Sequence, residues 1–508
     1  MSDSQTLHPR VPFVVVLLAF SGAMCALAGG YWDDAWHTER GRDDFFIAPH
    51  IAIYAGIAVA GAALAAWALL TARDHGTAIV WRHKPLALAL LSVSVTLASG
   101  PIDNAWHLAF GRDAVIWSPP HMLGIVGTLA LGAAILAELA PRPERWAALA
   151  TVVAGALVLA SAAFATVEYE TDVPQFDEVF HLPALGFAAS IGLVLIRAAA
   201  RTRWAATLST AVYTAFIVAV GGFLALVGFP PPALPLLVLP AIVVDLSARR
   251  RWHPAATAAL FTLALHVSYV PVRNLLGDGV RFDTADVLLG AALTFAATLA
   301  VFAVAAERPF APGSWLRRAA LAGPAASVVA LLLAAPLAGA HDPGQGEDAG
   351  TVALRLVAAE ERVALTARLP ADACATTEPV AIVARRGGES HRAPLSRSGC
   401  RLTGTVPAPE PGRWFVYAEM RRGTRAVESW LPISVGAGAT SISDPARYVY
   451  EPPERSGSIA KVLGTVALYA AMLALLYATF RLVRGSARQR GGEGRRPVSA
   501  AQHHGVGE

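Results

Sequence analysis

The chain has 508 residues, of which 55% are hydrophobic and only 15% are charged, and its mean hydropathy is +0.49. This composition is typical of a polytopic membrane protein and argues against an ordinary water-soluble enzyme. The formal net charge of +4 is spread over loops between apolar runs, so it indicates membrane topology and not nucleic-acid binding.

Twelve apolar runs approach the roughly 20 residues that a membrane span needs. They lie near residues 11–30, 47–72, 85–102, 116–140, 145–167, 182–200, 204–229, 232–248, 254–276, 284–306, 316–338 and 458–482. Arginine and lysine fall in alternate loops, which predicts that both ends of the chain are cytoplasmic. We expect a mainly α fold: a polytopic transmembrane helix bundle of about twelve spans, with one external all-β sandwich domain.

One polar motif occurs twice, each time between two apolar runs. The first copy is YWDDAWHTERGRDDFFIAPH at residues 31–50, and the second is GPIDNAWHLAFGRDAVIWSPPH at 100–121. An aspartate and a histidine four residues apart lie on one face of a helix. Another histidine follows at the start of the next run, so each copy offers one carboxylate and two imidazoles, a ligand set that suits a transition metal. The predicted metal ligands are Asp33, His37 and His50 in the first copy and Asp103, His107 and His121 in the second.

Other residues of the two copies are predicted to support the ligands. Histidine ligands usually donate their second N–H to an acceptor, a role that suits Asp43 and Asp113. For the tryptophans an interfacial belt is the first interpretation, and packing beside the ligands is the second. The alternative for the first copy is a salt-bridge cluster at the helix ends, with Arg40 and Arg42. The predicted supporting residues are Trp36, Arg42, Asp43, Trp106, Asn104, Arg112 and Asp113.

A third hairpin carries polar residues at a similar spacing without the intervening sequence. Glu168, Asp172 and His181 are therefore weaker candidates for metal ligands. Further along, His266, Tyr269 and Arg273 lie near the end of an apolar run. We interpret these three as a hydrated rim of the membrane domain.

The run at 316–338 has two interpretations. It is either a membrane span or a secretory signal, because Arg317 and Arg318 precede the apolar core and Ala338-Gly339-Ala340 forms an A-x-A cleavage pattern. Cleavage there would leave His341 as an N-terminal residue whose amine and imidazole can chelate copper. His341 is thus a further, weaker candidate ligand.

Residues 341–457 are predicted to form an external β-sandwich, cupredoxin-like or Ig-like, because short runs alternate apolar and polar residues between Gly and Pro. Cys374 and Cys400 are expected to form a disulfide in an oxidising compartment. The segment lacks the cysteine, histidine and methionine set of a type 1 copper site. Residues 1–340 thus form the membrane domain, 458–482 a final span and 483–508 a disordered cytoplasmic tail.

The two copies carry a resemblance to a known family. Asp33, Trp36, His37, Arg42, Asp43, Phe45 and His50 resemble the copper-ligand segment of the C subunit of particulate methane and ammonia monooxygenases. The longer spacing of Asp103, His107 and His121 is similar to that family's second ligand set, although Asp103 stands where the family has Asn. The segment 341–457, with His341, is reminiscent of the cupredoxin-like B subunit of the same superfamily.

The resemblance implies copper as the bound metal, and the ligand types would also accept zinc or iron. It implies a component of a copper-dependent membrane monooxygenase or oxidase that acts on a small apolar substrate. A non-catalytic copper transport or delivery protein is the alternative, and a haem protein with His37 and His107 as axial ligands is the third. Expected partners are the lipid bilayer, other monooxygenase-type subunits and further copies in an oligomer, in a bacterial inner membrane with the β domain periplasmic.

Overall fold

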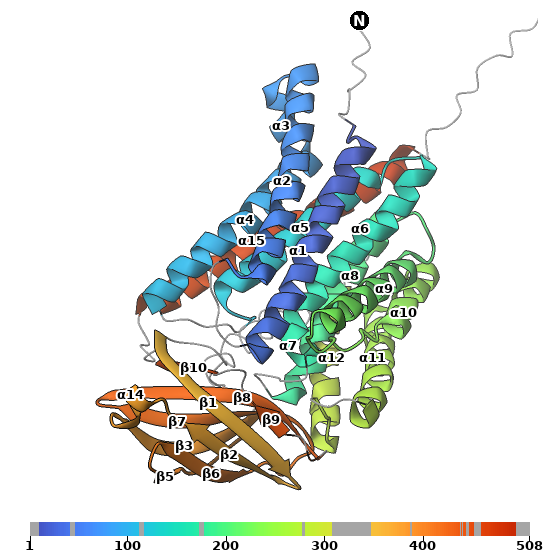
Figure 1. The fold of residues 1–508 in the computed structure, drawn as a ribbon. Coiled ribbons are helices and arrows are strands. Elements are labelled where there is room, and N and C mark those ends of the chain that lie inside the picture. The colour runs from blue at the N-terminus through green and yellow to red at the C-terminus, as the bar shows by residue number, and fades with distance from the viewer. Residues whose placement is uncertain are drawn as a thin grey trace, which may run out of the picture.

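The structure is a computed structural model of the chain. It describes residues 10–40, 46–110, 116–171, 177–276, 280–306, 347–386, 389–436, 438, 440–442, 447–451 and 459–493. Within these residues a helical bundle precedes an antiparallel β domain, and one last helix returns along the bundle (Figure 1). The predicted division into a membrane-type helical part and a β part is confirmed.

Ten helical segments among the described residues are long and apolar enough to cross a membrane, which supports a multi-pass membrane protein. Their main helices are α1 (Phe13–Glu39), α2 (Ala48–His75), α4 (Lys84–Phe110), α5 (Pro119–Leu139), α6 (Arg145–Ala163), α8 (His181–Ala199), α9 (Ala205–Leu226), α11 (Pro254–Leu276), α12 (Thr284–Ala305) and α15 (Ile459–Glu493). The short helices are α3 (Thr77–Arg82), η1 (Phe164–Thr166), α7 (Val167–Glu170), η2 (Glu178–Phe180) and α10 (Val238–Arg250).

Three predicted boundaries differ from the structure or fall outside it. The expected span at 232–248 is not a continuous helix: residues 231–237 have no regular structure, and only the 13-residue helix α10 follows. Pro231, Pro232 and Pro235 explain the difference, because proline lacks the N–H that a helix interior needs. The final helix continues beyond 482 to Glu493. The run at 316–338 and its A-x-A pattern lie outside the described residues.

The centre of the bundle is α5, with 83% of its most apolar window buried, whereas α15 buries only 11%. Small residues let neighbouring helices approach closely. A Cβ atom added to Gly22 of α1 would come within 2.5 Å of the Gly56 carbonyl oxygen of α2, and the reverse holds for Gly56. On α5, a Cβ at Gly127 would meet two backbone atoms of α4, Thr96 N at 3.1 Å and the Ser92 carbonyl oxygen at 3.2 Å. Both helix pairs that carry the repeated motif are therefore held together by backbone contact.

The β domain is antiparallel and barrel-like, with neighbouring strands in the order β4-β3-β7-β8-β10-β1-β2-β6-β5, and β9 also pairs with β1. Its strands are β1 (Glu347–Ala359), β2 (Arg362–Arg368), β3 (Thr377–Arg386), β4 (Glu389–Pro394), β5 (Ser396–Ser398), β6 (Arg401–Pro407), β7 (Gly412–Arg422), β8 (Arg425–Val435), β9 (Thr440–Ile442) and β10 (Arg447–Glu451). Strand β1 joins the two halves, because residues 347–352 pair with β10 and residues 353–359 pair with β2. The alternating pattern of apolar residues therefore predicted an antiparallel β domain here, and the structure shows it as barrel-like where a sandwich was expected.

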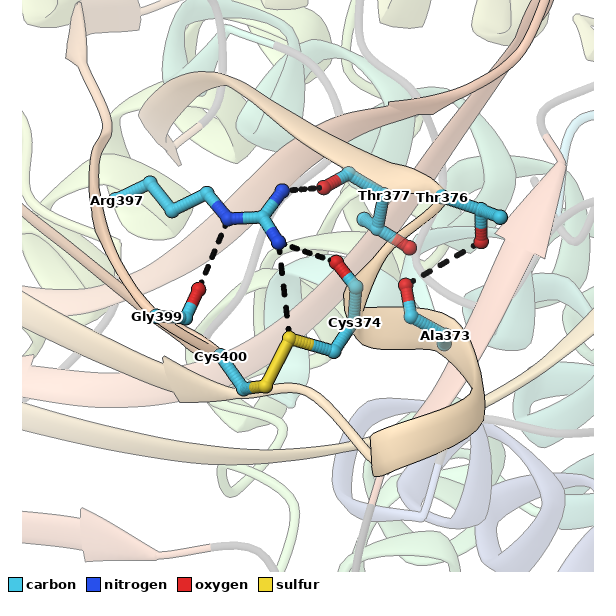
Figure 2. Close-up of a disulfide and its surroundings, with 7 residues drawn as sticks. All are labelled: Ala373, Cys374, Thr376, Thr377, Arg397, Gly399 and Cys400. Carbon is cyan, nitrogen blue, oxygen red and sulfur yellow. Dashed lines mark hydrogen bonds between the residues drawn. A yellow bond between two sulfur atoms is a disulfide. The ribbon is translucent and has the colours of Figure 1, made fainter.

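The predicted disulfide between Cys374 and Cys400 is present (Figure 2). It ties the short helix α14 (Ala371–Cys374) to the residue before β6. The Arg397 guanidinium donates to the carbonyl oxygens of Thr377 at 2.8 Å and of Gly399 at 2.9 Å, and also to that of Cys374. This corner of the domain is thus fixed by a covalent bond and by one arginine.

The β domain lies against the end of the bundle that carries the repeated motif, opposite α3 (Figure 1). Arg413 pairs with the Glu39 carboxylate, and Arg447 Nη1 donates to the Glu39 carbonyl oxygen at the end of α1. Arg386 Nε lies 3.4 Å from Glu178 Oε1. Burial lowers the pKa of both Arg413 and Arg447 to about 10, so both remain charged at neutral pH.

Candidate metal centre

The first copy of the motif brings its three predicted ligands together. Asp33 and His37 occupy the last two turns of α1, and His50 lies in the first turn of α2, directly after Pro49. His50 Nε2 lies 3.2 Å from Asp33 Oδ1, and His37 Nε2 lies 3.7 Å from Asp33 Oδ2. One ligand atom from each residue falls within 4.8 Å of the other two. In the part of the chain that the structure describes, this is the one such group of three.

These distances fit a metal ion. Imidazole nitrogen and carboxylate oxygen bind transition metals at about 2.0–2.2 Å, so two ligands of one ion lie roughly 3 to 4 Å apart. Both histidines direct Nε2 to the carboxylate, and His50 is the nearer of the two, beside the buried Asp33 Oδ1. The side chains are 15% to 21% exposed, which leaves the centre shielded without enclosing it. Two imidazoles and one carboxylate leave coordination positions open for other molecules.

Local sequence explains why the ligands meet. The spacing of four places Asp33 and His37 on one face of α1. A Cβ at Gly29 would come within 2.8 Å of Ile53 Cγ1, so α1 and α2 are in close contact one turn from the ligands. That contact brings the start of α2, and with it His50, to the face of α1 that carries the other two ligands.

The second copy repeats the central pair of the first. Asp103 Oδ1 on α4 lies 3.3 Å from His121 Nε2 on α5, which matches the 3.2 Å between Asp33 Oδ1 and His50 Nε2. The His107 side chain lies outside the described residues. Helix α2 of the first hairpin packs against α4 of the second, so the two hairpins lie side by side.

The predicted supporting tryptophans have packing roles. Trp36 stacks on Phe229 with ring centroids 5.9 Å apart, and the Arg40 guanidinium lies 5.6 Å from the Trp36 ring centroid. Trp106 is buried against Phe110 at 4.7 Å and against α15, where a Cβ at Gly464 would meet its ring at 3.0 Å. Asn104 is exposed. Arg42, Asp43, Arg112 and Asp113 lie outside the described residues.

The third hairpin uses its polar residues differently. Glu168 Oε1 accepts a hydrogen bond of 2.8 Å from the backbone N–H of Ile116. His181 is 1% exposed and stacks on Tyr169, with ring centroids 4.7 Å apart, and on Phe282 at 5.9 Å. Asp172 and His341, the other weaker candidates, lie outside the described residues.

Sequence reasoning missed a buried polar network beside the first hairpin. Tyr31 Oη lies 3.4 Å from both Glu170 Oε2 and Tyr213 Oη. Arg273 Nη2 donates to the Tyr169 carbonyl oxygen at 2.9 Å and lies within electrostatic range of the Glu170 carboxylate. The hydrated rim predicted for His266, Tyr269 and Arg273 is therefore wrong, because they are 8%, 1% and 6% exposed. Ionisable residues inside apolar helices were the available signal.

Comparisons with known proteins supply no relative: no family model, no curated protein and no solved structure matches this chain.

Proposed function

We propose that this chain is a copper-binding membrane protein and a component of a copper-dependent membrane monooxygenase or oxidase that acts on a small apolar substrate. One observation carries the proposal: an Asp/His/His group converges at the end of an apolar helical hairpin, and a second hairpin repeats its Asp–His pair at the same separation. The resemblance of both motifs to the copper-ligand segments of the particulate monooxygenases favours copper over zinc or iron.

Each of the three predicted ligands has its own role in binding the metal. Asp33 supplies a negative charge that stabilises a cation between the two imidazoles, and His37 and His50 supply neutral nitrogen donors when deprotonated. Copper bound there would supply redox chemistry and polarise small molecules at its open positions. Trp36, in the same last turns of α1 as Asp33 and His37, stacks on Phe229. The β domain, which contacts Glu39 two residues after His37, closes the same end of the bundle.

The alternative is a protein that carries or delivers copper without catalysis. The position of the β domain over the motif end of α1 favours it, because such a domain could pass ions to the Asp/His groups. An enzyme should consume O2 when given a reductant and substrate. A copper carrier should instead alter cellular copper tolerance when its gene is deleted. We place the chain in a bacterial inner membrane with the β domain periplasmic, in an oligomer or with other monooxygenase-type subunits.

The test is metal analysis of the purified full chain, with one variant for each hairpin. Asp33→Ala/His37→Ala and Asp103→Ala/His107→Ala should each lose part of the copper, and the combined variant should lose all of it. Asp74→Ala/His75→Ala removes the same residue types from the exposed far end of α2, so it should keep the full copper content. A wild-type protein that stays free of copper after reconstitution would refute the proposal.

A further inference from the structure

An apolar cavity of about 160 Å³ lies between α5, α6, α8 and α15, beside the second copy of the motif. Its lining is made of apolar and aromatic side chains, among them Trp117, Met122, Ala188, Tyr469, Met472 and Leu473. Each of these side chains is uncharged. Two of the lining residues flank the predicted ligand His121 in sequence: Met122 follows it directly, and Trp117 lies four residues before His121.

The polar atoms of the wall already have partners. Tyr469 Oη donates to the Trp117 carbonyl oxygen at 2.7 Å, and Trp117 Nε1 donates to the Ala165 carbonyl oxygen at 2.7 Å. The Tyr469 hydroxyl and the Trp117 N–H are thus both used in hydrogen bonds to backbone oxygens. An occupant would therefore meet apolar surface almost everywhere, and water, which needs two to four polar partners, is a poor one.

Size narrows the class of occupant. Apolar cavities of about 150 Å³ stay dry and bind molecules such as benzene or xenon. A cavity of 160 Å³ is in this range, and it is too small for the whole acyl chain of a phospholipid. Leu473 lines the cavity and is 51% exposed on α15, the helix that buries least of its surface in the bundle. An apolar molecule dissolved in the bilayer can thus reach the cavity from the side.

We infer that this cavity is a binding site for one uncharged apolar molecule of up to about the size of benzene, which enters from the bilayer past α15. Binding itself is independent of any metal. Only the further role of the cavity, as the place where substrate waits beside the Asp103 and His121 pair, rests on the proposed function. The last helix, α15, which follows the β domain in sequence, also contributes to this site: Tyr469, Met472 and Leu473 complete its wall.

Xenon is the probe, applied under pressure to crystals of the full chain, with its occupancy taken from anomalous difference density. Wild type should show one xenon position in the cavity. Ala188→Leu, which fills the cavity from α8, should lower the occupancy at least fivefold. The matched control Ala215→Leu adds the same atoms at an exposed position on α9 and should leave the occupancy unchanged.

A second variant keeps the test decisive if Ala188→Leu fails to fold. Met472→Ala enlarges the cavity from α15 and should raise the occupancy of soaked iodobenzene at least threefold over wild type. Wild type without xenon in the cavity, equal xenon occupancy in wild type and Ala188→Leu, or continuous acyl-chain density in the cavity would each overturn the inference. Xenon bound normally in the Asp33→Ala/His37→Ala variant separates this site from the copper proposal, because either can fail while the other holds.

Discussion

The first and third hairpins place similar residue types at the same end of the bundle and use them in opposite ways. At the first hairpin, two imidazoles and a carboxylate direct their ligand atoms to one point and remain 15% to 21% exposed. At the third, Glu170 is 1% exposed beside Arg273 and tyrosine hydroxyls, and His181 is stacked between aromatic rings. The first arrangement suits the binding of a cation, whereas the second already contains its own.

This contrast shows what a spacing of polar residues can and cannot establish. A carboxylate and a histidine in adjacent helices form a site only where their atoms converge. The first hairpin achieves this because small residues bring α1 and α2 into contact just before the ligands. In the third hairpin, Glu168 and His181 bind a backbone N–H and aromatic rings, so the same residue types become part of the packing.

Removal of Arg273 is expected to give the largest difference between the two hairpins, because it should lower stability without changing copper content. Arg273→Ala removes the buried guanidinium that donates to the Tyr169 carbonyl oxygen and lies within electrostatic range of Glu170, and it should destabilise the fold by about 3 kcal/mol. Copper content should not change in the protein that remains folded. The measurement is the free energy of unfolding in mixed micelles titrated with SDS. The double variant Arg273→Ala/Glu170→Gln should recover part of the loss where the two charges interact, and a single-variant cost below about 1 kcal/mol would contradict a structural role for the buried guanidinium.

Glu428, a buried carboxylate in the β domain, tests whether every buried carboxylate of this protein depends on a neighbouring cation. Burial raises the pKa of Glu428 to about 7, Arg385 opposes this effect, and Glu419, its direct partner on the neighbouring strand, adds to it. Because the folded pKa exceeds the ordinary value of 4.5, the folded state binds more protons between pH 4.5 and 7. The stability that this group contributes is therefore fully present below about pH 4.5 and is lost as the pH rises to about 7.

The expected loss is about 1.4 kcal/mol for each unit of difference between the two pKa values. Hydrogen–deuterium exchange of β7 and β8 in the full chain, corrected for the intrinsic exchange rate at each pH, gives the opening free energy. Glu428→Gln should remove this pH dependence. A wild-type opening free energy that stays constant or rises across this range would show that Glu428 ionises normally.

The sequence determines more of the helices and strands than of their contacts. Ten of the twelve predicted apolar spans coincide with helical segments among the described residues, and alternation predicted the β domain. The spacing of Asp33, His37 and His50 predicted a convergent ligand group. The interpretation of Tyr269 and Arg273 failed because their hydrogen-bond partners, the Leu236 N–H and the Tyr169 carbonyl oxygen, lie on other segments of the chain. Apolar periodicity does not report which helices become neighbours. The break before α10 was readable in principle from its prolines, but average hydropathy concealed it.

The smallest expected effect comes from one substitution made at two histidines. His181→Phe keeps an aromatic ring between Tyr169 and Phe282, and among the described residues neither ring nitrogen of His181 makes a hydrogen bond. Its unfolding free energy should therefore stay within about 1.5 kcal/mol of wild type, with copper content unchanged. His50→Phe should fold equally well and lose the copper of the first centre, because it removes the Nε2 atom that faces Asp33.

Copper content and unfolding free energy are measured for both variants. A packing role for His181 and a ligand role for His50 predict different copper contents and similar unfolding free energies. If His181→Phe also lost copper, His181 would be a ligand of the metal centre, and the rings of Tyr169 and Phe282 would hold it in place. If His50→Phe kept its copper, the 3.2 Å contact with Asp33 would be an ordinary ion pair at the end of two helices. The substitution therefore tests the role of each imidazole while leaving the carboxylates and the surrounding helices in place.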